Sequence, residues 1–223
     1  MIKAVIFDID GTLVDSVDMH AQAWKEAFEH FGKKIPFDEV RHQIGKGGDQ
    51  LMPVFFSKEE LAKKGSEMEK YRGDLFKRDF IKRVRAFPHV RDLFLRIRED
   101  EKRIALASSA KEEELKLYKR VARIEELVEE ETSADDADKS KPHPDIFEAA
   151  LERLNDVQAS EVIVIGDTPY DAEAAGKIGL RALGVLCGGF PEAELRAAGC
   201  LEIYQDPADI LARYEETLIA RKK

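Results

Sequence analysis

Short, continuous apolar runs alternate along the chain with segments in which apolar residues recur every three or four positions. The clearest runs lie at residues 2–7, 103–108, 162–166 and 180–185, and weaker ones lie near 127–132 and 201–204. Continuous runs of this length predict buried strands of a parallel sheet. Helical spacing predicts helices at residues 90–98, 112–120, 145–154, 172–178 and from 207 onward. This alternation predicts an α/β protein with a doubly wound parallel sheet.

The stretch after the first strand departs from the alternation. Apolar residues at helical spacing predict a helix over residues 17–31, with Asp15 or Ser16 as its N-cap. Further candidate helices lie at residues 37–43, 50–56, 58–72 and 75–85, and no strand pattern interrupts them. An insertion of this length is longer than an ordinary connection. We therefore expect an α/β core domain of residues 1–14 and 86–223 and an all-helical inserted domain of residues 15–85.

The composition is that of an ordinary globular chain and argues against several function classes. Of its 223 residues, 43% are hydrophobic and 36% are charged, and the net charge is −9. Nucleic-acid surfaces usually carry a basic stripe, so we expect no nucleic-acid partner. No apolar run is long enough to span a membrane or to act as a secretory signal, so we expect a cytoplasmic protein without membrane contact. The two cysteines are too few for a disulfide framework or a four-ligand zinc site. No feature of the sequence implies an obligate protein partner.

The first strand ends in two carboxylates. Asp8 and Asp10 follow the apolar run and precede Gly11. Because side chains alternate across a strand, both carboxylates should point the same way, at the carboxyl edge of the sheet, where open α/β folds bind ligands. They repel each other unless a cation lies between them or one is protonated. The pair indicates a metal site, an acid/base pair or both, although Asp before Gly also commonly starts a turn.

Three further polar groups stand at strand ends or in a proline-bounded loop. Ser108 and Ser109 close a strand before a helix, where they can bind an anion or simply cap the helix. Lys141 precedes a proline that excludes helical geometry, so it can project inward instead of lying on the surface. Asp167 ends another strand, and Asp171 lies four residues on. Such oxygen ligands suit Mg²⁺, and a turn with a helix cap is the alternative.

The segments that contain Asp8, Ser108, Lys141 and Asp167 form four motifs. Their residues and their order along nearly the whole chain resemble those of the haloacid dehalogenase superfamily. Within this superfamily, the chain resembles the phosphatase branch with a helical cap and is similar to β-phosphoglucomutase and phosphoglycolate phosphatase-like proteins. It implies that Asp8 is the nucleophile, which becomes an aspartyl phosphate, and that Asp10 is the general acid/base. It also implies that Ser108, Ser109 and Lys141 bind the phosphate.

The same resemblance implies the cofactor and the reaction. The cofactor is Mg²⁺, held by Asp8, by the backbone carbonyl of Asp10 and by Asp167, with Asp171 as a direct or indirect ligand. The reaction is hydrolysis of a small phosphate monoester, a sugar phosphate or similar metabolite. The inserted helical block would then be the cap over the site.

Two residues of the helical block are further candidates. Lys46 stands between Gly45 and Gly47, in a segment that resembles the substrate-specificity loop of the cap; a plain helix–helix turn is the alternative. His20 lies on the apolar stripe one turn before Trp24, as in β-phosphoglucomutase-type proteins. A packing histidine explains the same position.

Three other activities compete with hydrolysis. A phosphomutase is disfavoured because Gly166-Asp167 replaces the adjacent acidic pair of its fourth motif and because no cap arginine is evident near Lys46. A dehalogenase is disfavoured by the presence of Asp10 and Asp167. A non-catalytic binding or regulatory protein of the same fold would be expected to lack a catalytic carboxylate, and none is missing here.

Overall fold

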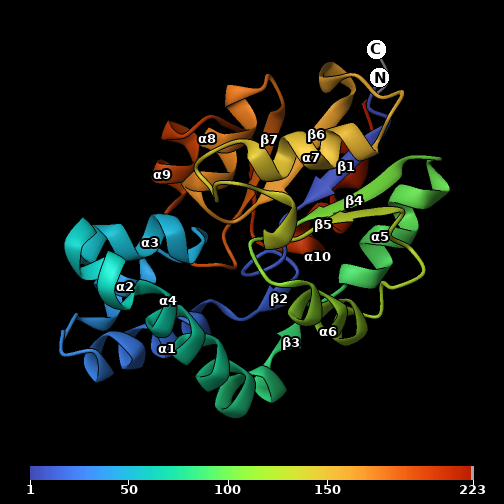
Figure 1. Ribbon diagram of the computed structural model, residues 1–223. Coiled ribbons are helices and arrows are strands. Elements are labelled where there is room, and N and C mark those ends of the chain that lie inside the picture. The colour runs from blue at the N-terminus through green and yellow to red at the C-terminus, as the bar shows by residue number, and fades with distance from the viewer. Residues whose placement is uncertain (222–223) are drawn as a thin grey trace.

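The computed structural model describes residues 1–221 and contains a six-stranded sheet with helices on both faces (Figure 1). The strand order is β5-β4-β1-β6-β7-β8, and every neighbouring pair is parallel. The strands are β1 (Ala4–Phe7), β4 (Arg103–Ala107), β5 (Glu130–Thr132), β6 (Val162–Gly166), β7 (Arg181–Val185) and β8 (Cys200–Tyr204). This arrangement confirms the predicted doubly wound α/β fold. The predicted core domain extends to residue 223, and its last two residues, 222 and 223, lie outside the described residues.

Alternating side chains on the strands build one hydrophobic core on each face of the sheet. On β1, Val5 and Phe7 belong to one cluster, and Ala4 and Ile6 belong to the other. The first cluster includes residues of α5 (Val90–Glu99), α6 (Glu112–Ala122) and α10 (Pro207–Ala212). The second includes residues of α7 (Asp145–Arg153), α8 (Pro169–Lys177) and α9 (Glu192–Ala197). Because both faces are buried, these strands read as continuous apolar runs in the sequence.

The inserted block is helical and has a core of its own. Its helices are α1 (Val17–His30), α2 (Phe37–Arg41), α3 (Gly48–Phe55) and α4 (Lys58–Leu75), and Figure 1 shows them grouped apart from the sheet. A third hydrophobic cluster joins Trp24 and Phe28 of α1 to Leu51 and Met68 of the following helices. The domain boundaries at residues 14/15 and 85/86 stay a prediction, which this separate cluster supports. None of the helices in residues 1–221 is both long and apolar enough to cross a membrane.

The helix predicted for residues 75–85 is not an α-helix beyond Leu75, and it ends at Arg83. A π-helical turn (Phe76–Phe80) and a 3₁₀ turn (Ile81–Arg83) follow α4, and β3 (Arg85–Ala86) then pairs antiparallel with β2 (Val14–Asp15). Figure 1 shows β2 and β3 between the helical block and the sheet. Strands of two residues are too short to leave a pattern in the sequence, and their pairing joins distant parts of the chain.

Two smaller features also differ from the prediction. Helix α9 was not predicted, because its six residues include a single buried one, Leu195, and no periodicity can show. Ser16 is the N-cap residue of α1, but neither its side chain nor that of Asp15 caps the helix. The Ser16 hydroxyl donates its hydrogen bond to Asp10 instead.

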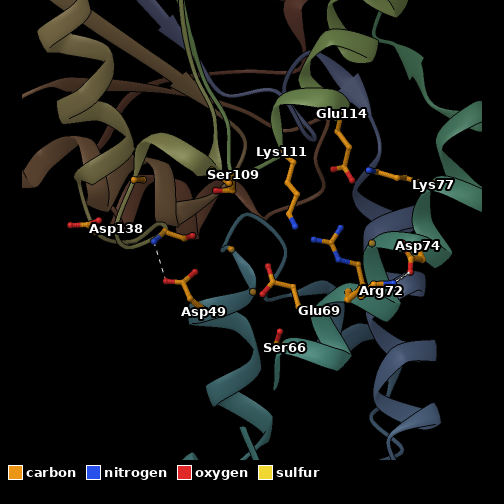
Figure 2. A pocket seen from close by; sticks show the side chains of 17 residues that line it. Asp49, Ser66, Glu69, Arg72, Asp74, Lys77, Ser109, Lys111, Glu114 and Asp138 are labelled. Atoms are coloured by element: carbon orange, nitrogen blue, oxygen red, sulfur yellow. Dashed lines mark hydrogen bonds and ion pairs between the residues drawn. The ribbon is translucent and has the colours of Figure 1, made fainter. Parts of the chain in front are cut away.

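A cavity of about 520 Å³ lies between α4 and the loops that follow β4 and β5 (Figure 2). A smaller cavity of about 50 Å³ adjoins it, deeper in the molecule, and includes Asp8 in its lining. Gly47, Arg72, Ser109 and Glu114 line both cavities. The helical block and the sheet domain thus line two adjoining cavities, and we call the one of about 50 Å³ the inner cavity and the one of about 520 Å³ the outer cavity.

Candidate active site

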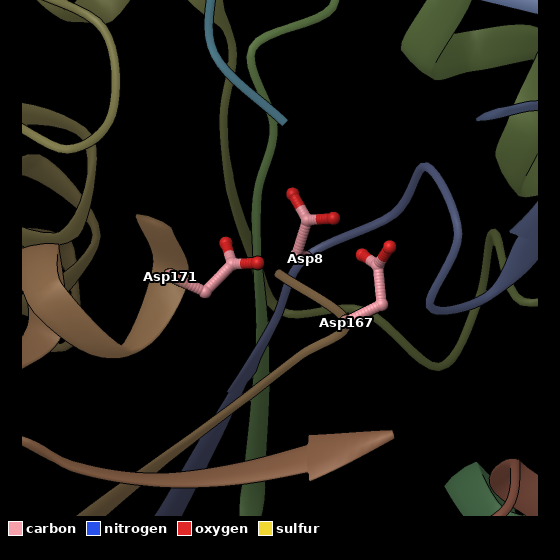
Figure 3. A group of neighbouring side chains, drawn as sticks. All are labelled: Asp8, Asp167 and Asp171. Atoms are coloured by element: carbon pink, nitrogen blue, oxygen red, sulfur yellow. The ribbon is translucent and has the colours of Figure 1, made fainter. Parts of the chain in front are cut away.

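Three carboxylates meet at the carboxyl edge of the sheet. Strands β1 and β6 are neighbours with Phe7 opposite Ile165, so the residues that follow each strand emerge side by side. Asp8, Asp167 and Asp171 each offer an oxygen, and these oxygens lie within 4.8 Å of one another (Figure 3). All three side chains are almost fully buried. Their mutual repulsion favours a positive charge nearby or protonation of one carboxyl group.

Lys141 supplies one positive charge. Its Nζ donates hydrogen bonds to Asp8 Oδ1 at 2.5 Å and to Asp171 Oδ1 at 2.7 Å, and the residue is 1% exposed. Burial acts to lower the pKa of Lys141, but the charges of Asp171 and Asp8 outweigh it and raise this pKa. The amine is therefore protonated. Lys141 thus projects inward from its loop, as expected, and its amine lies between the carboxylates of Asp8 and Asp171.

A single lysine does not balance the three acids. Burial, followed by the charges of Asp171 and Asp10, raises the pKa of Asp8 to about 7 against the opposing effect of Lys141. Burial and the charges of Asp8 and Asp171 also raise the pKa of Asp167 well above its usual value. The site therefore disfavours a full set of negative charges and has the electrostatics of a site for a further cation.

Asp167 has an oxygen available for that cation. Thr12 Oγ1 donates to Asp167 Oδ1 at 3.1 Å, whereas Oδ2 is buried without a hydrogen-bond partner. The space around Oδ2 depends on two glycines, because a Cβ at Gly11 or Gly188 would lie 2.3 or 1.7 Å from this oxygen. Gly11 also has a φ of +81°, which favours glycine. An orphaned carboxylate oxygen in an acidic group fits a hard metal ion such as Mg²⁺.

Asp171 already uses both of its oxygens. Oδ1 accepts from Lys141, and Oδ2 accepts from Thr168 Oγ1 at 2.7 Å in the capping box at the start of α8. Asp171 therefore caps α8, as the helix-cap alternative predicted, and it also contacts Lys141. A Cβ at Gly166 would lie 2.4 Å from Asp171 Cγ, so Asp171 folds back over the end of β6 only because position 166 is glycine.

Asp10 lies beside this group and is held by α1. Ser16 Oγ donates to Asp10 Oδ1 at 2.5 Å, and His20 Nε2 lies 3.0 Å from the same oxygen. His20 Nε2 also lies 3.1 Å from Tyr118 Oη, and the imidazole stacks on Phe76. Burial acts to raise the pKa of Asp10, but His20 and then Ser16 outweigh it and lower this pKa. His20 is therefore a buried packing residue that also orients Asp10 and, without substrate, favours the ionised form of its carboxyl group.

The two serines after β4 take different positions. Ser108 is fully buried, and its Oγ accepts a hydrogen bond from the Ala110 N–H at 3.0 Å, which fixes the turn before α6. Ser109 lines both the inner and the outer cavity. The structure thus brings Ser109 to the cavities, while the Ser108 hydroxyl serves the local turn.

The loop that carries Lys46 packs against the core. Lys46 lines the inner cavity, donates to Gln43 Oε1 at 2.6 Å and lies 4.5 Å from the ring centroid of Tyr170. Burial lowers the pKa of Lys46. A Cβ at Gly47 would lie 2.0 Å from Ser140 Oγ, next to Lys141. The helical block therefore touches the loop that carries the buried lysine and closes the inner cavity.

One lining residue was missed in the sequence. Arg72 on α4 lines both cavities, and its Nε is buried without a partner. Its guanidinium lies 4.9 Å from the ring centroid of Trp24. Helix α4 is rich in charged residues, so nothing in the sequence sets Arg72 apart from its neighbours.

Comparisons with known proteins support this description. Residues 5–185 match the model of the family described as haloacid dehalogenase-like hydrolase. A phosphorylated carbohydrates phosphatase from Thermotoga maritima is 28% identical over 217 residues, covering 97% of this chain and 100% of that protein. A β-phosphoglucomutase from Bacillus subtilis is 29% identical over 201 residues, covering 82% of this chain and 83% of that protein.

Solved structures give the same result for the fold. The crystal structure of a hydrolase from Pseudomonas syringae matches with a TM-score of 0.86 at 27% identity. The match covers 96% of this chain and 98% of that one. The core with its helical cap is thus shared over nearly the full length.

Replacing Lys141 should destabilise the protein strongly. Lys141→Met leaves two buried carboxylates without their cation, and breaking a buried ion pair in this way costs about 3–5 kcal/mol. Denaturant unfolding of metal-free protein at neutral pH measures the loss. Lys139→Met, at an exposed position two residues away, is the matched control. Similar losses in both variants would contradict the role assigned to the Lys141 charge.

Proposed function

Because the chain belongs to the haloacid dehalogenase-like hydrolase family, we propose that it hydrolyses a small phosphate monoester with Mg²⁺ through an aspartyl-phosphate intermediate. The observation that carries the proposal is the buried group of Asp8, Asp167 and Asp171 around the Lys141 amine. Relatives named as a phosphatase of phosphorylated carbohydrates and as a β-phosphoglucomutase support a phosphorylated metabolite as substrate. The inner cavity, of about 50 Å³, suits a phosphoryl group.

In the first step, a carboxylate oxygen of Asp8 attacks the phosphorus atom. The bond from phosphorus to the ester oxygen breaks, and the leaving oxygen takes the proton of Asp10, whose protonated form is favoured by the anionic phosphoryl group beside it. Lys141 lies at the Asp8 carboxylate and offsets the repulsion between this carboxylate and the anionic phosphoryl group. Positioning and charge neutralisation of this kind are the main requirements of phosphoryl transfer.

In the second step, Asp10 removes a proton from water, whose oxygen attacks the phosphorus of the aspartyl phosphate. The bond from phosphorus to Asp8 breaks, which releases inorganic phosphate and restores the carboxylate. Ser16 and His20 hold the Asp10 carboxylate in place through these exchanges. We also propose that Ser109 and the turn fixed by Ser108 bind the phosphoryl oxygens.

Mg²⁺ fits the acidic group. We propose that Asp8, the backbone carbonyl of Asp10 and the unpartnered Oδ2 of Asp167 hold the ion, while Asp171 acts through Lys141. When bound, Mg²⁺ supplies positive charge to the phosphoryl oxygens during transfer. The buried setting strengthens these electrostatic effects because water is excluded.

Hydrolysis is favoured over the phosphomutase alternative by the geometry at Gly166. A phosphomutase of the β-phosphoglucomutase type carries an adjacent acidic pair in the motif that reads Gly166-Asp167 here. A side chain at position 166 would clash with Asp171, whose Cγ lies 2.4 Å from the Cβ position. An acidic residue therefore cannot replace Gly166 while Asp171 binds Lys141. The Bacillus subtilis relative keeps the phosphomutase as the second candidate.

Removing the nucleophile should abolish phosphate release. With Mg²⁺ and a panel of small phosphomonoesters, Asp8→Asn should lower kcat by a factor on the order of 10⁴ or more, because its amide cannot form the intermediate. Asp92→Asn, at an exposed aspartate on α5, should keep wild-type rates. Retained turnover in Asp8→Asn would contradict the nucleophile. No release by the wild type would favour a sugar phosphate interconversion, which the same substrates test.

Mg²⁺ should stabilise the protein through Asp167. At about 100 times its Kd, a bound ion adds about 2.7 kcal/mol, which raises Tm by roughly 5–10 °C for a chain of this size. In Asp167→Asn the rise should be mostly lost, and the metal-free variant should melt above the wild type because burial opposes ionisation of Asp167. Thermal denaturation with chelator and with Mg²⁺ measures both effects. Equal rises in the two proteins would remove Asp167 from the metal site.

Contact between the helical block and the core should limit turnover. Gly47→Ala places a Cβ 2.0 Å from Ser140 Oγ and so opposes closure, and we expect kcat/KM to fall by about tenfold or more with little change in Tm. Adding Ser140→Gly to this variant removes the clash with Ser140 and leaves the movable carboxylate of Asp49, whose Oδ1 lies 2.8 Å from the Cβ position, so it should restore part of the activity. A double variant no better than Gly47→Ala would show that the loss has another cause.

A further inference from the structure

The helical block also contacts the core at a place that belongs to neither cavity. The contact is made by the end of α2, where Arg41 donates a hydrogen bond to the Gly188 carbonyl, in the segment that follows β7. Next to it, Tyr170 Oη of α8 donates to the His42 carbonyl at 2.7 Å. The His42 imidazole packs on Phe190, with 5.1 Å between the ring centroids. None of these five residues lines the inner or the outer cavity, so this contact is separate from the space proposed for the substrate.

Arg41 joins three segments of the chain through one guanidinium. Its Nε donates to Asp18 Oδ1 of α1 at 2.6 Å, and its Nη2 donates to the Gly188 carbonyl at 2.9 Å. A Cβ at Gly189, where φ is +89°, would lie 2.5 Å from Nη2, so this close approach requires glycine. Because the guanidinium is planar, the ion pair with Asp18 also orients the nitrogen that reaches Gly188. We call residues 187–189 the β7 loop.

The other side of the β7 loop borders the acidic group. A Cβ at Gly188 would lie 1.7 Å from Asp167 Oδ2, the buried oxygen without a hydrogen-bond partner. Cys187 Sγ donates to the Gly11 carbonyl at 3.2 Å, and Gly11 is the second glycine beside this oxygen. Cys187 therefore links the two backbone segments that enclose Oδ2, and Arg41 links one of them to the helical block.

The composition of the β7 loop explains why it needs such contacts. Two of its three residues are glycines, which lose more conformational freedom on ordering than any other residue. The loop nevertheless has to keep one conformation, because Mg²⁺ demands near-ideal octahedral geometry from its ligands. A shift of the backbone beside Asp167 would change the space around Oδ2. A contact that fixes the loop therefore acts on the metal site without touching the ion.

We propose that Arg41 is a positioning residue that couples the helical block to the metal site. It holds the β7 loop against Asp167, so that Oδ2 stays enclosed and directed at the ion. This inference rests on the proposed function, because it takes Asp167 as a ligand of Mg²⁺. Coupling between two sites is reciprocal, so a bound ion in turn strengthens the contact between Arg41 and the β7 loop.

Calorimetric titration of the metal-free protein with Mg²⁺ tests the coupling without turnover. Arg41→Gln should raise the Kd for Mg²⁺ about fivefold or more, the lower end of typical couplings between sites. Loss of a positive charge by itself favours a cation, so a higher Kd cannot come from charge alone. Arg41→Lys keeps the charge without the planar group and should restore part of the affinity. Asp18→Asn leaves the donor to Gly188 in place and should raise the Kd less than Arg41→Gln.

Two control variants separate this effect from a general loosening of the contact. Tyr170→Phe removes the hydrogen bond to the His42 carbonyl in the same contact but leaves Arg41 in place. Glu39→Gln changes an exposed charge of α2. Both variants should bind Mg²⁺ as the wild type does. A wild-type Kd in Arg41→Gln, or an equal rise of the Kd in Arg41→Gln and Tyr170→Phe, would overturn the inference.

Hydrogen exchange of the metal-free protein separates this inference from the proposed function. The amides of residues 187–189 should exchange about fivefold faster or more in Arg41→Gln, because the loop opens locally when it loses this contact. Glu39→Gln should keep the wild-type rates. Unchanged exchange in Arg41→Gln would refute the positioning role even if the Kd rises. If the wild type binds no Mg²⁺, the metal site of the proposed function fails, and the exchange rates alone decide whether Arg41 positions the β7 loop.

Discussion

The rest of the site depends on the ion pairs of one buried amine, that of Lys141. It is hydrogen-bonded to carboxylates from β1 and α8 and so connects three separate parts of the chain. A buried ion pair adds little net stability, since each charge must leave water, but losing one partner is costly. The arrangement is therefore better explained by chemistry than by folding. It keeps Asp8 beside a positive charge and leaves one oxygen of Asp167 free to bind a second positive charge.

Steric room for this group comes from residues without side chains. Gly11 and Gly188 border the free oxygen of Asp167, and Gly166 borders Asp171. At each of these glycines, a side chain would occupy space that a carboxylate, or an ion bound to it, needs. The backbone thus approaches the acidic group closely on several sides, and water is excluded without a large apolar wall. The same close packing explains how a helix cap and a lysine contact can share Asp171.

Much of the fold could be predicted from the sequence, because buried parallel strands appear as apolar runs and the helices between them show regular spacing. The positions of Asp8 and Asp167 followed from the same runs, since each comes at a strand end. The pairing of β2 with β3 could not be predicted, because it joins residues far apart in the chain. Arg72 could not be singled out either, since only its place over Trp24, at the junction of two cavities, distinguishes it from the other charges of α4.

The short ribbon of β2 and β3 has a consequence for how such proteins diversify. Val14 lies opposite Ala86, so the chain leaves the sheet domain and returns to it at neighbouring points. Everything between these points could be exchanged for another segment, or shortened to a tight turn, without moving a strand of the sheet. The acidic group that follows β1 and β6 and the helical block that covers it are therefore separable units of inheritance. One sheet domain could acquire new substrates through replacement of a single continuous stretch of gene.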